Sequence, residues 1–281
     1  MKLSVMSYTL ARQGWKKNGA FDLKGMGELA RSLEIDGVDM VTDYGLEAAE
    51  IRRVLDDYGL DVVCYTFSGA GLNAETAAER CAGVDAVKEG LDTAAALGTD
   101  TVMLITPGKP GVPRDVSRRR YIRGLQESAA LARQAGIRPT LENFPGADSP
   151  FVISSDVLEA VREVPGLKLT FDNGNVLLGG EDPAASFARC AAHVIHAHFK
   201  DWVRAAPGAG MEALDGRRYT PALIGEGVVD QKACLAAMQS AGYGGHINIE
   251  YEGNQYLPDD ATRRAARCLR ERMVELEGGA P

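Results

Sequence analysis

The feature that most constrains the fold of this 281-residue chain is an alternation of short apolar runs with segments of helical length. Each apolar run is short enough for one strand and is bounded by Gly, Pro, Asp or Asn, which favour turns. The segments between these runs carry apolar residues at helical spacing. The expected strands are residues 3–9, 37–41, 60–68, 100–106, 137–144, 167–175, 194–201 and 246–253.

Eight strand-then-helix units predict an α/β fold, a single (β/α)8 TIM barrel over residues 1–281, because such barrels typically take about 250 residues. An open, doubly wound sheet is the alternative. The first strand-to-helix turn argues against that sheet, since "YTLARQGWKKNGAF" contains no GxGxxG-type phosphate loop. Two longer insertions, residues 105–116 and 202–227, follow the fourth and seventh strands. In a barrel, both would lie on the catalytic face.

Charge and cysteine content narrow the class of protein. A net charge of −8 disfavours nonspecific attraction to nucleic acid or to an anionic membrane. No run of apolar residues is long enough for a signal peptide or a membrane span, so we expect a cytoplasmic protein. The five cysteines are scattered and include no CxxC pair, which indicates neither a disulfide framework nor a thiolate zinc site.

Four polar residues lie near the ends of the last four expected strands: Glu142, Asp172, His198 and Glu250. In a barrel, the carboxyl ends of the strands form the rim of the active site. Side chains alternate between the two faces of a strand, so these four converge if their faces point inward. Each one alone could instead be a buried polar group satisfied by the backbone or by a neighbouring Lys or Arg. Four on consecutive strands favour a shared site.

Carboxylate oxygens with one imidazole nitrogen make a ligand set suited to one divalent metal ion, Mn²⁺, Mg²⁺ or Co²⁺, with Zn²⁺ as a further option. Clustered carboxylates would repel one another unless a cation neutralised them. A metal ion that binds a substrate carbonyl acts as a Lewis acid, and a nearby carboxylate can then remove the α-proton. The chemistry of these residue types is thus compatible with metal-assisted proton transfer.

Three further motifs accompany these residues: "NGN" after Asp172, "HAHFKDW" around His198 and "IEYEG" around Glu250. Together they resemble the xylose-isomerase-like superfamily of TIM barrels, which includes sugar phosphate isomerases and epimerases, over essentially the whole chain. The resemblance implies that Glu142, Asp172, His198 and Glu250 bind one divalent metal. It also implies that Glu142 and Glu250 flank the substrate and transfer protons on opposite faces of a carbon beside a carbonyl.

The same resemblance indicates substrate contacts. Asp148 and Arg204 stand where ketose epimerases keep a substrate-contacting acid and arginine. The chain departs from the pattern at Asn175, where a histidine is frequent, and at Phe144, where relatives often carry "ENH". Asparagine still donates and accepts hydrogen bonds but does not titrate. We expect all four residues to contact the substrate.

Lys200 lies on the same strand face as His198, so we also place it at the substrate. It could stabilise an oxyanion, or pair with Asp201 or with a ligand carboxylate. We expect His196 one layer deeper, as a hydrogen-bonded core histidine. Trp15 belongs to a set of rim aromatics that could stack on a sugar.

We expect a divalent-metal-dependent sugar isomerase or epimerase that acts by α-proton transfer on a nonphosphorylated keto-sugar or related polyol. The alternatives are a lyase of the same fold, which would dehydrate a keto-inositol or eliminate a keto-glycoside, and a non-catalytic barrel that serves as a partner subunit. An apurinic endonuclease with three zinc ions is disfavoured because the first four strands contain no histidine. A homo-oligomer is compatible with all of these.

Overall fold

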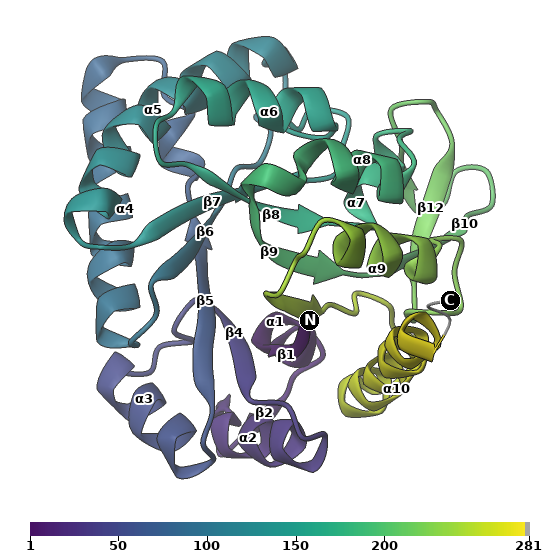
Figure 1. The fold of residues 1–281 in the computed structure, drawn as a ribbon. Coiled ribbons are helices and arrows are strands. Elements are labelled where there is room, and N and C mark those ends of the chain that lie inside the picture. The colour runs from purple at the N-terminus through teal and green to yellow at the C-terminus, as the bar shows by residue number, and fades with distance from the viewer. Residues whose placement is uncertain (279–281) are drawn as a thin grey trace.

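The computed structural model describes residues 1–278, and its centre is a closed barrel of parallel strands in the order β1-β13-β9-β8-β7-β6-β5-β4 (Figure 1). This confirms the predicted (β/α)8 TIM barrel. The strands coincide with the eight apolar runs. They are β1 (Lys2–Met6), β4 (Gly37–Val41), β5 (Asp61–Ser68), β6 (Thr101–Ile105), β7 (Arg138–Glu142), β8 (Lys168–Asp172), β9 (Val194–Phe199) and β13 (His246–Ile249).

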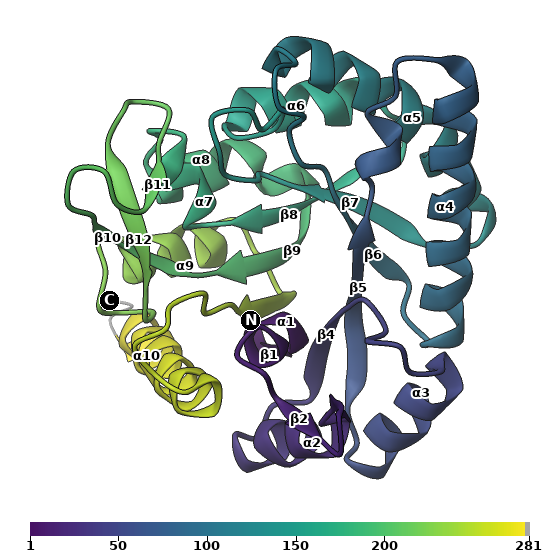
Figure 2. The same ribbon diagram turned by 180° about the vertical axis from the view of Figure 1, so that it is seen from behind.

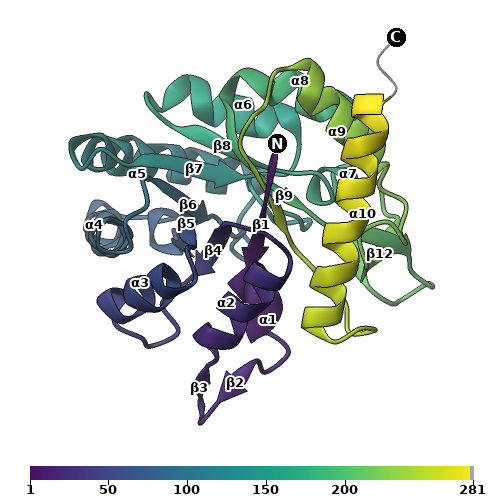
Figure 3. The same ribbon diagram turned by 60° about the horizontal axis from the view of Figure 1, so that its bottom comes forward.

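Helices surround the strands, as Figures 1 and 3 show from two directions. Local signals set several of their starts: Thr76 and Glu79 form a reciprocal capping box at α4, and Asp182 caps α8 just before Pro183. The longer helices are α2 (Leu23–Ser32), α3 (Ala48–Asp57), α4 (Ala77–Ala96), α5 (Arg114–Gln134), α6 (Ser154–Glu163), α8 (Pro183–Cys190), α9 (Gln231–Ser240) and α10 (Pro258–Gly278), and the short ones are α1 (Ser7–Ala11) and α7 (Asn175–Leu178). Within residues 1–278, none is long and apolar enough to cross a membrane.

The polar residues of the strands face the inside of the barrel. Thr140 Oγ1 and Thr170 Oγ1 lie 2.7 Å apart on the neighbouring strands β7 and β8. Asp39 on β4 and His196 on β9 are also in contact, although these strands are not neighbours. Side chains from two such strands can meet only across the interior, so these residues point inward. The alternate residues, such as Leu141 and Ala197, are buried on the opposite face of their strands.

The insertion after β9 forms a small antiparallel sheet of its own, in the order β10 (Asp201–Arg204), β12 (Arg218–Ala222), β11 (Met211–Glu212). Figure 2 shows it projecting to one side of the barrel. The buried carboxylate of Asp201 accepts hydrogen bonds from four backbone N–H groups, those of Trp202, Gly225, Gly227 and Val229. The two ends of the insertion are therefore held together at one side chain.

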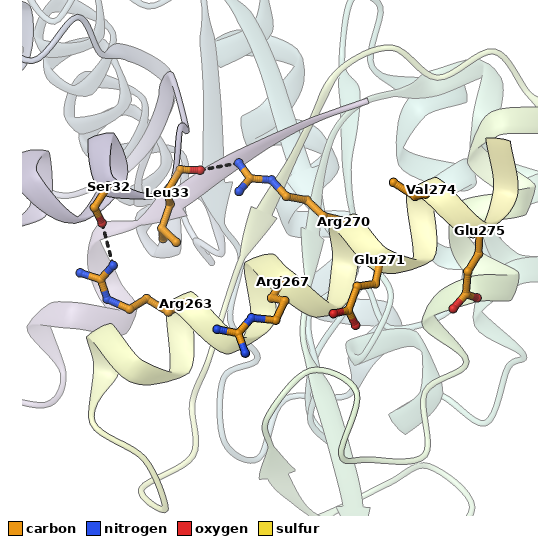
Figure 4. A pocket seen from close by; sticks show the side chains of 8 residues that line it. All are labelled: Ser32, Leu33, Arg263, Arg267, Arg270, Glu271, Val274 and Glu275. Carbon is orange, nitrogen blue, oxygen red and sulfur yellow. Dashed lines mark hydrogen bonds between the residues drawn. The ribbon is translucent and has the colours of Figure 1, made fainter. Parts of the chain in front are cut away.

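The last helix, α10, packs beside the carboxyl end of α2. Arg270 donates hydrogen bonds to the backbone carbonyls of Leu33 and Glu34, and Arg263 donates to Ser32 Oγ at 2.7 Å (Figure 4). Cations stabilise the exposed carbonyls at the end of a helix. The hollow between the two helices, about 740 Å³, is thus lined by side chains that join the first and last long helices of the ring.

Candidate metal centre

The four predicted ligands meet at the carboxyl ends of their strands. Glu142 and Asp172 are the last residues of β7 and β8, His198 is the penultimate residue of β9, and Glu250 directly follows β13. One ligand atom from each lies within 4.8 Å of those of the other three, and all four residues are buried. The barrel brings them together because these strands are consecutive in the sheet order.

Hydrogen bonds orient these ligands. His198 Nδ1 lies 2.8 Å from Glu142 Oε1 and 3.5 Å from Glu250 Oε2. Asp172 Oδ1 accepts hydrogen bonds from the backbone N–H groups of Gly174 and Asn175, at 2.8 and 2.6 Å. These bonds leave the second oxygen of Asp172 directed toward the cluster.

Two oxygens of the cluster, Asp172 Oδ2 and Glu250 Oε2, are buried and have no hydrogen-bond partner among residues 1–278. Burying a carboxylate oxygen without a hydrogen bond is costly, and a bound cation would offset this cost. Three carboxylates and one imidazole nitrogen are the donor set that hard and borderline divalent cations prefer. The residues present therefore fit a divalent metal ion.

Lys200 compensates part of the negative charge. Its Nζ lies 2.9 Å from Glu250 Oε1, 3.4 Å from Asp172 Oδ2 and 3.2 Å from Glu252 Oε2. Lys200 was expected to pair with Asp201 or with a ligand carboxylate. The structure shows the pairing with the carboxylates of Asp172 and Glu250. Asp201 instead accepts hydrogen bonds from backbone N–H groups. Glu252 was not among the predicted site residues, although the strand expected over residues 246–253 would place it on the same face as Glu250.

Burial and charge shift the pKa values of this cluster. Burial alone would lower the pKa of Lys200, but the carboxylates of Asp172, Glu250 and Glu252 raise it well above its ordinary value. Burial likewise opposes the charged form of His198, while Glu142 and Asp39 raise the pKa of its imidazole. Burial raises the pKa of Asp172 despite the nearby Lys200. Negative charge thus dominates the surroundings of both basic groups, which favours binding of a cation.

A second polar layer lies beneath the ligands. His196 Nε2 is 2.5 Å from Asp39 Oδ2, and Ser4 Oγ donates to Asp39 Oδ1 at 2.8 Å. This is the deeper, hydrogen-bonded position expected for His196. Asp39 was not recognised from the sequence, where its only signal is an acidic residue inside the apolar run "GVDMV".

A cavity of about 250 Å³ opens above the cluster. Its charged lining comes from β7, β9 and the segments that follow β9 and β13, and includes Lys200 and Glu252. The opposite arc, β1, β4, β5 and β6, supplies mostly apolar side chains, and α1, β11 and the segment after β7 complete the lining. The apolar lining residues are Met6, Val41, Met103, Ile105, Phe144, Pro145 and Met211.

Of the six predicted substrate-binding residues, Lys200 and Phe144 line this cavity and the other four do not. Asn175 is buried beside Asp172, with both polar atoms of its amide unpartnered. Trp15 Nε1 donates to the carbonyl of Asp22, and the guanidinium of Arg204 stacks 5.0 Å from the centre of the Tyr219 ring. Asp148 is exposed on the loop between β7 and α6.

The sequence model of the xylose isomerase-like TIM barrel family matches residues 28–272. The chain belongs to this family. The match confirms the resemblance drawn from the motifs around Asp172, His198 and Glu250. It covers every strand of the barrel except β1.

Curated proteins similar in sequence to this chain include an inosose dehydratase and a rhizopine catabolism protein. An inosose dehydratase of Lacticaseibacillus casei is 30% identical over 140 residues, which cover 47% of this chain and 46% of that protein. The match thus spans about half the length of this curated relative. The rhizopine catabolism protein MocC of Rhizobium meliloti is 25% identical over 236 residues, 77% of this chain and 70% of that protein.

Solved structures share the fold at low sequence identity. D-psicose 3-epimerase from Clostridium cellulolyticum H10 superposes with a TM-score of 0.77 at 13% identity, covering 97% of this chain and 99% of that one. This likeness shows the fold.

Proposed function

We propose that this protein is a divalent-metal-dependent sugar isomerase or epimerase that transfers a proton at the carbon beside a carbonyl. The observation that carries the proposal is the buried cluster of Glu142, Asp172, His198 and Glu250, three of which line a cavity. Two of its carboxylate oxygens have no hydrogen-bond partner among residues 1–278. A divalent cation bound there supplies Lewis-acid polarisation of a substrate carbonyl.

Glu142 and Glu250 are the proposed proton-transferring pair. Their strands, β7 and β13, are the two ends of the four-strand arc that carries the ligands, so the two carboxylates approach the cavity from different sides. In an epimerase, one carboxylate removes the α-proton and the other delivers a proton to the opposite face. Glu250 Oε2 has no hydrogen-bond partner in the described chain and is free to accept a proton.

Lys200 has two proposed roles at this site. Its ammonium group lies 2.9 Å from Glu250 Oε1 and so holds that carboxylate at the wall of the cavity. It also places a positive charge where negative charge develops on a substrate oxygen as the α-proton leaves. Preorganised charge of this kind is among the larger contributions to catalysis.

The lining of the cavity favours a small, nonphosphorylated keto-sugar or polyol. Its apolar side carries no lysine or arginine that could pair with a phosphate, and Phe144 offers an aromatic face for stacking. We keep Asn175 as a proposed contact because its unpartnered amide lies next to Asp172. Contacts from Trp15, Asp148 and Arg204 would require the loops of Trp15 and Asp148, and the end of β10 at Arg204, to move toward the cavity.

A metal-dependent lyase is the second candidate, supported by the similarity to an inosose dehydratase. Such a reaction begins with the same α-proton removal. One glutamate then suffices as base, and the second glutamate or a water molecule protonates the leaving hydroxyl.

The decisive experiment combines metal analysis with turnover in D₂O across ketoses, keto-inositols and keto-glycosides. We expect one divalent ion per chain and deuterium at the α-carbon of the product. An epimerised product of unchanged composition supports the isomerase, whereas loss of one water supports the dehydratase. A metal content near zero after reconstitution would contradict the proposal. So would complete retention of the original hydrogen, once substrate labelled at that carbon has excluded shielded return of the same proton.

A further inference from the structure

The cavity above the acidic cluster is divided between two halves of the barrel. The half that contains β7, β9 and β13 brings the charged side chains to it. The other half is one continuous arc, because β6 pairs with β5, β5 with β4, and β4 with β1. We call its lining residues the uncharged arc. They are Met6, Val41, Thr66, Met103 and Ile105.

The uncharged arc offers little to a hydroxyl group in the cavity. The hydroxyl oxygen of Thr66 is buried from solvent. The backbone carbonyls of Thr66 and Ile105 already accept hydrogen bonds from the N–H groups of Thr42 and Gly69, both at 2.9 Å. Of the lining residues on this side, this leaves Tyr8 on α1, 37% exposed, to provide a hydroxyl. A ligand hydroxyl buried against the strands of the arc would therefore lose its hydrogen bonds to water without replacement.

We propose that the substrate carries a methyl or methylene group, in place of a hydroxyl, on the part that faces the uncharged arc. This inference rests on the proposed function. The keto and hydroxyl oxygens of such a substrate belong at the charged side, with Glu142, Glu250 and Lys200, so the rest of the molecule faces the other half of a cavity of about 250 Å³. Deoxy-ketoses and O-methyl ethers of keto-polyols share this chemistry. Val41 and Met103 are then residues that determine specificity.

A competing interpretation is that the uncharged arc faces the C–H groups of a fully hydroxylated ketose, since apolar walls also pack against the C–H faces of sugars. The two interpretations differ in the effect of deleting a hydroxyl from the ligand. Deletion strengthens binding if that hydroxyl would be buried without a partner. Deletion weakens binding, or leaves it unchanged, if the hydroxyl points to Tyr8 or to the charged side.

The test measures the affinity of the full-length protein, loaded with Mg²⁺, for matched probes by NMR titration. The first pair is L-erythrulose and 1-hydroxy-2-butanone, which share a hydroxyketone group and differ in the hydroxyls of the tail. The second pair is a keto-inositol and its mono-O-methyl ethers. We expect the alkyl member to bind tighter by about 10- to 100-fold, the usual effect of burying a hydroxyl without a partner. The first pair tests a deoxy carbon and the second tests a methyl ether.

Three variants show whether the uncharged arc causes this preference. Val41→Thr replaces a methyl group by a hydroxyl at similar volume, and should reduce the preference by about 2- to 10-fold, the value of one hydrogen bond. Met103→Gln tests the same point from β6. The matched control is Val38→Thr. Val38 lies on the same strand as Val41 but is fully buried and does not line the cavity, so its replacement should lower stability and leave the preference unchanged.

Equal affinities within both pairs, or tighter binding of the hydroxylated members, would overturn the inference. A preference that Val41→Thr and Met103→Gln leave unchanged would do so too, as would failure of every probe to bind the metal-loaded protein. If the protein also exchanges the α-proton of a ketose, the proposed function stands in each of these cases. Protein that binds no metal and exchanges no proton, yet prefers the alkyl members, would instead refute the proposed function and retain the preference of the cavity.

Discussion

At the scale of single residues, Lys200 is the internal counter-ion of the acidic cluster that forms the proposed metal centre. Its ammonium lies within 3.4 Å of carboxylate oxygens from Asp172, Glu250 and Glu252, and it is almost fully buried. The carboxylates raise the pKa of this lysine, so it stays charged over the ordinary pH range. The stability of the centre without metal should therefore depend on this one side chain.

Lys200→Met should lower the free energy of unfolding of the metal-free protein by about 3–5 kcal/mol, the usual cost of leaving buried charge uncompensated. In saturating Mn²⁺ the decrease in the free energy of unfolding should be smaller, because the cation then neutralises part of the carboxylate charge. Urea unfolding with and without the ion measures both values. Lys232→Met, which removes only a pairing with Glu275 at the surface, is the control. An equal loss under both conditions would speak against the counter-ion role.

A second prediction for single residues concerns the reaction rate after replacement of Glu142 or Glu250. Glu142→Gln and Glu250→Gln keep the shape of each side chain but remove the base, so each should reduce the rate by about 10²–10⁴. Steady-state rates on the substrate found in the D₂O screen measure this loss. Metal content must be determined in parallel, because both residues also belong to the ligand set. A variant that retains its metal and the full rate would exclude its glutamate from proton transfer.

At the scale of helices and strands, the contact of α10 with α2 closes the ring of helices. Arg270 caps two carbonyls at the end of α2, Leu33 and Glu34, on the side of the molecule that Figure 4 shows. Arg267, one turn earlier on α10, also lines this hollow but makes no such hydrogen bond. The two arginines thus differ in what each contributes.

Arg270→Ala should lower the free energy of unfolding by about 1 kcal/mol, the typical value of a hydrogen bond that caps a helix end. Arg267→Ala should change it much less. Chemical denaturation gives both numbers. Metal content and rate should match the wild type in both variants, because α10 contributes no residue to the cavity. Loss of metal in Arg270→Ala would show coupling that the contacts do not indicate.

At the scale of the whole molecule, binding at the barrel mouth should be measurable as stability. A ligand that binds only the folded chain stabilises it by about 2.7 kcal/mol at a concentration one hundred times its Kd. We therefore expect the melting temperature to rise with Mn²⁺ concentration and to return on addition of a chelator. His198→Ala should remain folded and lose this rise. An identical rise in His198→Ala would place the ion elsewhere.

The barrel could be predicted from the sequence because each strand is a short apolar run and each helix has its own periodicity. The clustering of the four proposed ligands could be predicted too, because parallel strands bring their carboxyl ends together. The contacts of Asp39 could not be predicted from the sequence, because a single buried carboxylate in an apolar strand can find hydrogen-bond donors on many different residues. The positions of Trp15 and Asp148 depend on loop conformations, which carry no periodic pattern, and that of Arg204 depends on the small sheet formed by the insertion after β9. The sequence placed them at the substrate, and the structure places them outside the lining of the cavity.

The carboxylate of Asp201 allows the insertion after β9 to vary in sequence and in length. It binds backbone N–H groups at both ends of the excursion between β9 and α9, and a side chain at Gly227 would collide with it. The excursion thus leaves and rejoins the barrel at one fixed point. Because this junction does not depend on the intervening chain, residues such as Met211 can change, and the segment can lengthen or shorten, without disturbing the ligands below. The insertion that covers the cavity can therefore change during evolution, while the residues at the base of the cavity stay in place.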